Sequence, residues 1–220
     1  VLSVKILKIV NSAYYRYKTT SIQNAVVYLG ISALRDLIIT FSMFNEDAFS
    51  DEVSDILSIL WEFSQLCNFY TKKVFEALTK QKLNSQYSSI GLISNIGYLV
   101  LLQNFPDSFR QYLVDLKKLN KREFYDIDHK YFGIEHYKMG SYLLNWWDFS
   151  TSSLDIVLYH HDVSRVEQIY KKDQFEYNMI KALEISDVMA WKKMGYLSDF
   201  NEVEEVYQEI FDKINDEIGD

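Results

Sequence analysis

Proline, glycine and cysteine are scarce in this sequence. One proline and seven glycines in 220 residues leave few positions that break a helix, and the many Leu, Ile, Lys and Glu residues favour helix formation. The single cysteine, Cys67, excludes an internal disulfide and fits a reducing cytoplasm. We therefore expect an all-α, cytoplasmic protein in which the lone cysteine is a small buried residue.

Long apolar runs and an excess of positive charge are also absent. No apolar run reaches the ~18–20 residues that cross a bilayer, and no signal-peptide pattern is present. The net charge of −8 disfavours nucleic acid and anionic membranes as main partners. A hydrophobic content of 48% and an aromatic content of 16% instead indicate one packed domain, or one domain with two lobes.

Residues 1–41 have the pattern of three short helices. The chain opens inside the first of them and has no initiator Met, which predicts further residues before Val1. Ser21 is placed to cap the second helix, and Gly30 is placed to end it. Ser32 is expected to cap the third helix.

A tyrosine-rich stretch separates the first two of these helices. Tyr14, Tyr15 and Tyr17 offer large contact areas with polar tips, which is the chemistry of protein-interaction hot spots. We expect a partner-binding surface here; the alternative is that the rings seal the junction between two lobes. Stacking on nucleic-acid bases is disfavoured by the negative charge of the chain.

The stretch from Gly91 to Leu102 is apolar on nearly every face and predicts one buried helix, which follows a longer helical pattern over residues 53–80. Its two glycines, at 91 and 97, permit close contact with neighbouring helices. Ser94 and Asn95 form a polar pair in its middle. Because a buried polar group without a partner costs roughly 1–3 kcal/mol, this pair marks either a satisfied hydrogen bond or the floor of a site.

Further helical patterns follow at 107–119, 122–131, 133–146, 150–160 and 180–189. His129 lies among charged residues, including Asp128, and is expected on a solvated face. His160 and His161 are adjacent near the end of a helical pattern. Neighbouring residues of a helix point about 100° apart, so only one of the two is expected to face a given pocket.

The last segment, 198–220, has nine acidic residues and one lysine, with apolar residues at helical spacing. We expect an acidic amphipathic helix that docks on its own domain or on a partner, because its apolar stripe is too large to stay solvated. The residues expected to make this contact are Val206, Tyr207, Ile210 and Ile214.

Several motifs, in the same order along the chain, resemble the HDOD family, a non-catalytic relative of the HD-domain phosphohydrolases. The N-terminal matches are Asn11-Ser12-Ala13, Ser21-Ile22, Ala25-Val26, Leu29-Gly30 and Leu34-Arg35. The later matches are the glycine frame of 91–100, the G-x-x-H-x-x-x-G pattern of 133–140, Tyr159-His160-His161 and 183–187. The resemblance implies an HD-domain-like multi-helix bundle with an N-terminal helical lobe at 1–48 and an HD-like lobe at 49–196. The acidic helix, assigned to 197–220, lies beyond the region of resemblance.

The resemblance also implies that an ancestral metal site has decayed. Metal-binding relatives use His, His-Asp and Asp where this chain has Phe63, Ser94-Asn95 and Asp187, and a tyrosine replaces their lysine at position 98. Phenylalanine cannot bind a metal, and neutral Ser and Asn oxygens are poor ligands. We therefore expect no metal, no cofactor and no catalytic residue. The vestigial pocket is predicted to contain Phe63, Ser94, Asn95, Tyr98, His136, His160, His161 and Asp187.

Two functions follow from these observations. The resemblance implies a non-catalytic regulatory module of bacterial signal transduction, which acts by binding protein partners or a small ligand. The alternative is a divergent metal-dependent phosphohydrolase or phosphodiesterase. In that enzyme His136, His160, His161 and Asp187 would provide three nitrogens and one oxygen, a ligand set that zinc accepts.

Overall fold

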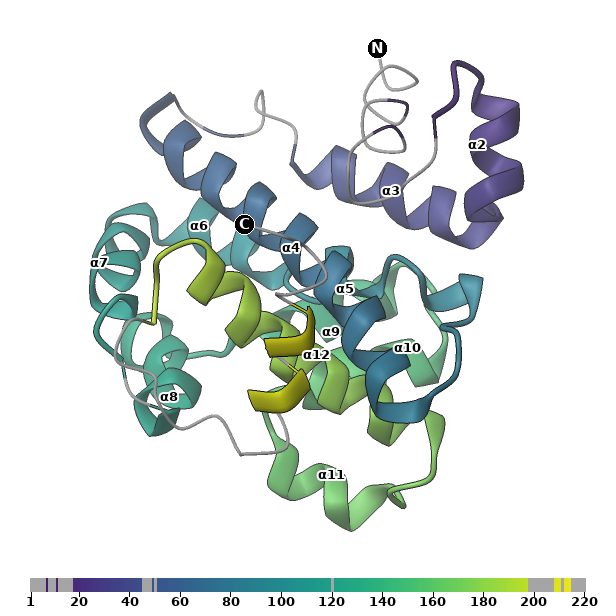
Figure 1. The fold of residues 1–220 in the computed structure, drawn as a ribbon. Helices are drawn as coiled ribbons and strands as arrows, with labels where there is room; N and C mark the ends of the chain where they lie inside the picture. The colour runs from purple at the N-terminus through teal and green to yellow at the C-terminus, as the bar shows by residue number, and fades with distance from the viewer. Residues whose placement is uncertain are drawn as a thin grey trace.

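The structure is a computed structural model, and it describes residues 7, 11, 18–44, 49, 51–119, 121–197, 208–210 and 212–214. Within these residues all regular structure is helical (Figure 1), which confirms the all-α expectation. No described helix has the length and apolar character needed to cross a bilayer. The helices are α2 (Ile22–Leu29), α3 (Ile31–Met43), α4 (Ser54–Thr79), α5 (Ile90–Ile93), α6 (Gly97–Asn104), α7 (Pro106–Leu116), α8 (Lys121–Phe132), α9 (His136–Trp146), α10 (Thr151–Tyr159), α11 (Val163–Ile169) and α12 (Phe175–Lys193), with short 3-10 turns at Asp51–Val53 and Ser85–Tyr87.

Two long helices, α4 and α12, form the centre of the molecule and pack along each other (Figure 1). Every residue of α12 from Met179 to Trp191 is buried, which explains why its sequence shows little amphipathic pattern. Two of its three buried charged residues, Lys181 and Glu184, form an ion pair at 3.3 Å. Each fully buried apolar side chain in this core contributes about 1.5–3 kcal/mol, so this pair of helices supplies much of the stability.

The N-terminal helices α2 and α3 lie together on one side of this centre (Figure 1). As predicted, the Ser21 hydroxyl caps α2 by accepting the Asn24 amide, and Gly30 ends the helix with a φ of 81°. The expectation that Ser32 caps the next helix is wrong. Gly30 itself takes the N-cap position, because its positive φ lets α3 begin at the next residue.

A small second core joins these helices to the centre. Ala25, Leu37 and Leu92 are buried against one another, and Leu92 belongs to α5. A buried hydrogen bond strengthens the same junction: the Ser89 hydroxyl donates to Asp36 Oδ2 at 2.7 Å. The N-terminal helices therefore share packed contacts with the rest of the molecule.

The predicted single helix over Gly91–Leu102 is in fact two helices, α5 and α6, separated by a turn at residues 94–96. Around the turn the backbone amides donate to the carbonyl three residues earlier instead of four. The Ile96 amide donates to the Ile93 carbonyl at 3.2 Å, and the Tyr98 amide to the Asn95 carbonyl at 3.0 Å. The Ser94 hydroxyl donates to the Gly91 carbonyl and competes with the helical pattern. The turn places the polar pair inside the molecule.

The described part of the C-terminal segment lies against this body. Ile214 is buried within the main hydrophobic core, and Ile210 is partly buried against it. Val206 and Tyr207 lie outside the described residues, as do Tyr14, Tyr15 and Tyr17. The docking role of this segment and the role of the tyrosine stretch therefore stay predictions.

Candidate functional site

All eight residues expected in the vestigial pocket meet at one buried place beside α12. They arrive from six parts of the chain: Phe63 from α4, Ser94 and Asn95 from the turn before α6, Tyr98 from α6, His136 from the start of α9, His160 and His161 from the turn after α10, and Asp187 from α12. Sequence reasoning thus identified residues that the fold brings together.

Asp187 is the hub of this cluster and uses both of its carboxylate oxygens. Oδ1 accepts hydrogen bonds from Asn95 Nδ2 at 3.0 Å and from the Cys67 thiol at 2.7 Å. Oδ2 lies 2.9 Å from His161 Nε2 and 3.3 Å from His160 Nε2. Burial raises the pKa of Asp187, but the two imidazoles outweigh burial and hold this pKa far below the usual range of a carboxyl group. Asp187 is therefore a buried carboxylate anion.

Cys67 belongs to this cluster, which the sequence analysis missed. It was expected only to fill space, and it is fully buried, but its thiol also donates to Asp187. Burial raises the pKa of the Cys67 thiol well above its ordinary value, and the neighbouring Asp187 charge raises it further. The group is therefore a protonated donor with no nucleophilic character. Its position four residues after Phe63 on one helix was a signal that could have revealed it.

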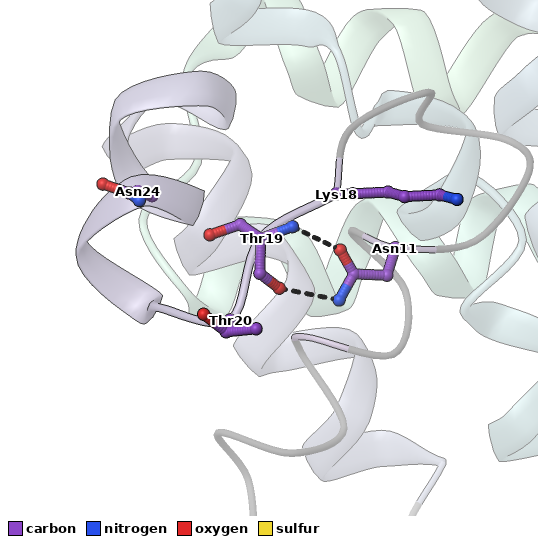
Figure 2. A pocket seen from close by; sticks show the side chains of 5 residues that line it. All are labelled: Asn11, Lys18, Thr19, Thr20 and Asn24. Atoms are coloured by element: carbon purple, nitrogen blue, oxygen red, sulfur yellow. Dashed lines mark hydrogen bonds between the residues drawn. The ribbon is translucent and has the colours of Figure 1, made fainter.

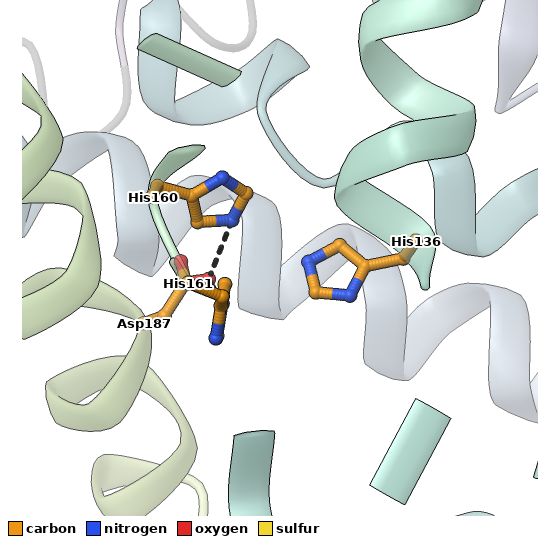
Figure 3. A group of neighbouring side chains, drawn as sticks. All are labelled: His136, His160, His161 and Asp187. Atoms are coloured by element: carbon orange, nitrogen blue, oxygen red, sulfur yellow. Dashed lines mark hydrogen bonds and ion pairs between the residues drawn. The ribbon is translucent and has the colours of Figure 1, made fainter. Parts of the chain in front are cut away.

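His160 and His161 both face Asp187, contrary to the expectation that only one could do so. Helix α10 ends at Tyr159, and both histidines lie in the turn that follows, closed by a hydrogen bond from the Asp162 amide to the Tyr159 carbonyl. The 100° spacing of helical neighbours does not apply in this turn. Figure 3 shows the two imidazoles beside the Asp187 carboxylate. Burial lowers the pKa of His161 to about 4, so this imidazole is neutral at neutral pH.

His136 approaches the same group from α9, and a second carboxylate holds it in place. Asp128 Oδ2 lies 2.5 Å from His136 Nδ1 and also accepts the His136 backbone amide at 2.8 Å. Burial raises the pKa of Asp128, but the charge and hydrogen bonds of His136 outweigh burial and leave this pKa below its ordinary value. The expectation of a solvated face is right for His129, whose side chain is 69% exposed. Its neighbour Asp128 instead points inward to His136.

The backbone around His136 has no spare room. A Cβ at Gly97 would overlap the carbonyl oxygen of His136, and a Cβ at Gly91 would press on the backbone of Asn68 in α4. Both glycines therefore serve the close helix contacts that the sequence predicted. They bring the turn containing Ser94 and Asn95 against α4 on one side and against α9 on the other.

Aromatic rings pack around the cluster of His136, His160, His161 and Asp187. Phe63 stacks on Trp191, with ring centroids 4.0 Å apart, and Tyr98 stacks on His136 at 3.9 Å. The Tyr98 hydroxyl shares a hydrogen bond of 2.8 Å with Tyr112. Burial raises the pKa of both phenols well above the usual value, so both stay protonated. Phe63, at the position where the resemblance implies a metal ligand in related enzymes, is part of an aromatic core here.

Phe63, Ser94 and Asn95, at positions where the resemblance implies metal ligands, do not fit a metal ion. Phe63 offers no lone pair, the Ser94 hydroxyl donates to a backbone carbonyl, and Asn95 presents its amide nitrogen to Asp187. A neighbouring set does have metal-ligand character. His136, His160, His161 and Asp187 each offer one ligand atom, and these atoms lie within 4.8 Å of one another.

Two hollows elsewhere differ from this buried cluster. One of about 480 Å³ is lined by Asn11, Lys18, Thr19, Thr20 and Asn24 (Figure 2). There Asn11 forms two hydrogen bonds with Thr19: its side-chain amide donates to the Thr19 carbonyl, and its oxygen accepts the Thr19 amide. A second hollow, of about 260 Å³, lies beside Arg35, Asp36 and Phe149. Neither contains an arrangement of groups that would support catalysis in the described residues.

Comparison with known proteins agrees with this geometry. The chain matches the HDOD domain family over residues 1–163. Its fold is similar to that of an HDOD domain protein of unknown function from Geobacter sulfurreducens, at 22% identity and a TM-score of 0.64, covering 96% of this chain and 68% of that one. It is also similar to a "putative phosphohydrolase" from Shewanella amazonensis, at 19% identity and a TM-score of 0.57, covering 95% of this chain and 71% of that one.

A "putative metal-dependent phosphohydrolase" from the same Shewanella species has a TM-score of 0.56 at 18% identity, covering 97% of this chain and 70% of that one. No curated protein matches the chain. At these identities the solved structures support the fold, while the family match extends over most of the sequence. The chain therefore belongs to the HDOD family.

Proposed function

We propose that this chain is a non-catalytic regulatory module of bacterial signal transduction, which works in the cytoplasm by binding protein partners. The observation that carries the proposal is the stacking of Phe63 on Trp191 at 4.0 Å. In metal-dependent relatives a histidine at this position binds the first metal ion. A stacked aromatic pair at that place stabilises the core and cannot hold a metal or an activated water.

The hydrogen bonds and the burial of the cluster support the same proposal. Asp187 Oδ1 is engaged by the neutral donors of Asn95 and Cys67. Catalytic zinc sites keep one position open for water. Here the four ligand-bearing side chains are nearly inaccessible, with the side chain of His161 only 4% exposed and that of His160 fully buried. A phosphate ester has no access to groups buried in this way.

The surfaces that would bind a partner stay predictions from the sequence. The candidates are the tyrosine stretch 14–17 and the apolar stripe of the C-terminal segment. Ile214 is already buried in the core of its own chain, so a partner would have to contact other residues of that segment.

The alternative function is a divergent metal-dependent phosphohydrolase, and one observation favours it. His136, His160, His161 and Asp187 place three imidazoles and a carboxylate within 4.8 Å, a ligand set of the kind found in zinc enzymes. An enzyme of this kind would need a local opening that admits both substrate and water to the cluster.

A hydrolysis assay separates the two functions. The purified chain is incubated with aryl phosphate mono- and diesters and with cyclic dinucleotides, with Mn²⁺ or Zn²⁺ present. The matched variants are Asp187→Asn, which alters the cluster, and His129→Gln, which changes an exposed histidine outside it. We expect no turnover that distinguishes the wild type from Asp187→Asn. Saturable turnover that is lost in Asp187→Asn and kept in His129→Gln would establish the enzyme instead.

A further inference from the structure

The histidine cluster contains buried nitrogen lone pairs that lack donors. His160 Nδ1 lies 2.6 Å from the Val157 carbonyl oxygen. A carbonyl only accepts hydrogen bonds, so Nδ1 carries the hydrogen and Nε2 of the neutral ring is a lone pair. This lone pair faces Asp187 Oδ2 at 3.3 Å, which is an anionic acceptor. At this distance the contact is favourable only with a positive charge beside it, either a proton on Nε2 or a metal ion bound by both atoms.

His136 presents the same situation more sharply. Its Nδ1 is bound to the Asp128 carboxylate at 2.5 Å, which places the hydrogen on that nitrogen. Its Nε2 is buried and has no hydrogen-bond partner in the described part of the chain. Figure 3 shows this nitrogen pointing toward the other three side chains. A proton added to Nε2 would be a buried donor without an acceptor, whereas a metal ion would use the lone pair directly.

The charges of the cluster point the same way. Asp128 and Asp187 bring two carboxylates into the core, where they are 4% and 1% exposed. Buried carboxylates are found paired with cations or bound to metals. One divalent cation would balance both charges, and His136 would connect it to the more distant carboxylate.

We propose that this cluster binds one Zn²⁺ ion as a closed structural site, displaced from the ancestral metal position. The ligands are Nε2 of His136, His160 and His161 and an oxygen of Asp187. Asp128 is a positioning residue that orients His136 from behind, an arrangement common among metal-bound histidines. Three imidazoles and one carboxylate suit Zn²⁺ better than Mg²⁺ or Ca²⁺. The proposal goes beyond the regulatory function and does not depend on it.

The distances are compatible with this coordination. Tetrahedral zinc bonds of ~2.0–2.1 Å place ligand atoms about 3.4 Å apart. Asp187 Oδ2 is 3.3 Å from the His160 nitrogen and 2.9 Å from the His161 nitrogen, and all four ligand atoms lie within 4.8 Å. The longest of these separations would have to shorten toward about 3.4 Å when the ion binds. His161 binds the ion by moving its hydrogen from Nε2 to Nδ1, so no proton is gained or lost in that step.

The test is a metal titration of the full chain. Protein stripped with a chelator is titrated with Co²⁺ and then with Zn²⁺, followed by the visible spectrum, elemental analysis and the melting temperature. We expect about one ion per chain, the intense visible bands of tetrahedral Co²⁺, displacement by Zn²⁺, and a rise in melting temperature. His136→Gln and Asp187→Asn are expected to lose stoichiometric binding. Asp128→Asn is expected to weaken binding about 10–100-fold. His129→Gln is the matched control and is expected to bind as the wild type does.

The wild-type spectrum keeps the test decisive if a cluster variant fails to fold, as judged by circular dichroism. Absence of stoichiometric binding to the wild type would overturn the proposal and indicate that a buried water meets His136 Nε2. A weak, six-coordinate Co²⁺ spectrum would overturn it too, since it reports surface binding, as would full retention of binding in His136→Gln. Hydrolysis is measured separately: turnover by the loaded protein would contradict the regulatory function and leave the metal site in place.

Discussion

The two sides of Asp187 have opposite characters. On the Oδ1 side, toward α4, neutral donors from Asn95 and Cys67 occupy the carboxylate, and stacked Phe63 and Trp191 fill the adjoining space. On the Oδ2 side, His160 and His161 face the carboxylate. One side is an ordinary core held by stacking and hydrogen bonds, while the other has a metal-ligand composition. The unsuitability of Phe63, Ser94 and Asn95 as metal ligands therefore does not exclude a cation site on the Oδ2 side.

The largest expected effect on stability comes from a substitution on the Oδ1 side, in the Phe63–Trp191 stack. Phe63→Ala removes a fully buried ring that stacks on Trp191, and should lower the free energy of unfolding by about 3–5 kcal/mol. Phe63→Leu keeps most of the volume and should cost clearly less. Urea unfolding followed by circular dichroism measures both. Equal stability of the wild type and Phe63→Ala would show that this side is not a packed core.

The second-largest effect on stability is expected at Asp187. Asp187→Asn removes the charge that accepts hydrogen bonds from both sides, and should lower the free energy of unfolding by about 2–3 kcal/mol, since hydrogen bonds to charged groups are the stronger ones. The measurement is made in chelator, so that any bound ion does not contribute. A variant as stable as the wild type would mean that the carboxylate is not the hub of the cluster.

The close backbone contact between Gly97 and His136 gives a third comparison, between two glycine substitutions. Gly97→Ala would place a methyl group against the His136 carbonyl and should cost about 1–3 kcal/mol by forcing α6 and α9 apart. Gly140→Ala is the control, because its added carbon would lie at 3.4 Å from the Ser94 carbonyl oxygen, close to ordinary contact. Thermal unfolding of the two variants compares them. Equal melting temperatures would argue against the close approach at Gly97.

Much of the fold follows from local sequence signals. The cap at Ser21 and the stop at Gly30 formed as predicted, because capping depends on neighbouring residues alone. The break at residues 94–96 could not be predicted from the pattern of apolar residues. A continuous apolar run predicts one helix, and only tertiary contacts favour a turn within it. Helix α11 was also missed.

The candidate site was predictable only in part. Family motifs identified its eight residues, but they could not show what lies behind them. Asp128 reads as one of several surface charges in the sequence, and only the packing of α8 against α7 and the approach of α9 turn it toward His136. The partnership of Cys67 with Asp187 spans 120 residues of sequence and has no local signature.

The smallest effect is expected at Cys67. Cys67→Ser keeps a hydroxyl donor for Asp187 Oδ1 and should change the free energy of unfolding by less than about 1 kcal/mol. Cys67→Ala removes the donor from a buried charge and should cost about 1–3 kcal/mol. Chemical unfolding of the pair isolates the hydrogen bond. If alanine is tolerated as well as serine, the thiol fills space and does not act as a donor.

The most direct test of the contrast between the two sides is a crystal of the chain soaked in Zn²⁺ and measured at the zinc absorption edge. The account predicts one buried anomalous peak, bounded by His136, His160, His161 and Asp187, and none between Phe63 and Asn95. A peak on the Phe63 side, or no buried peak at full soaking, would contradict it.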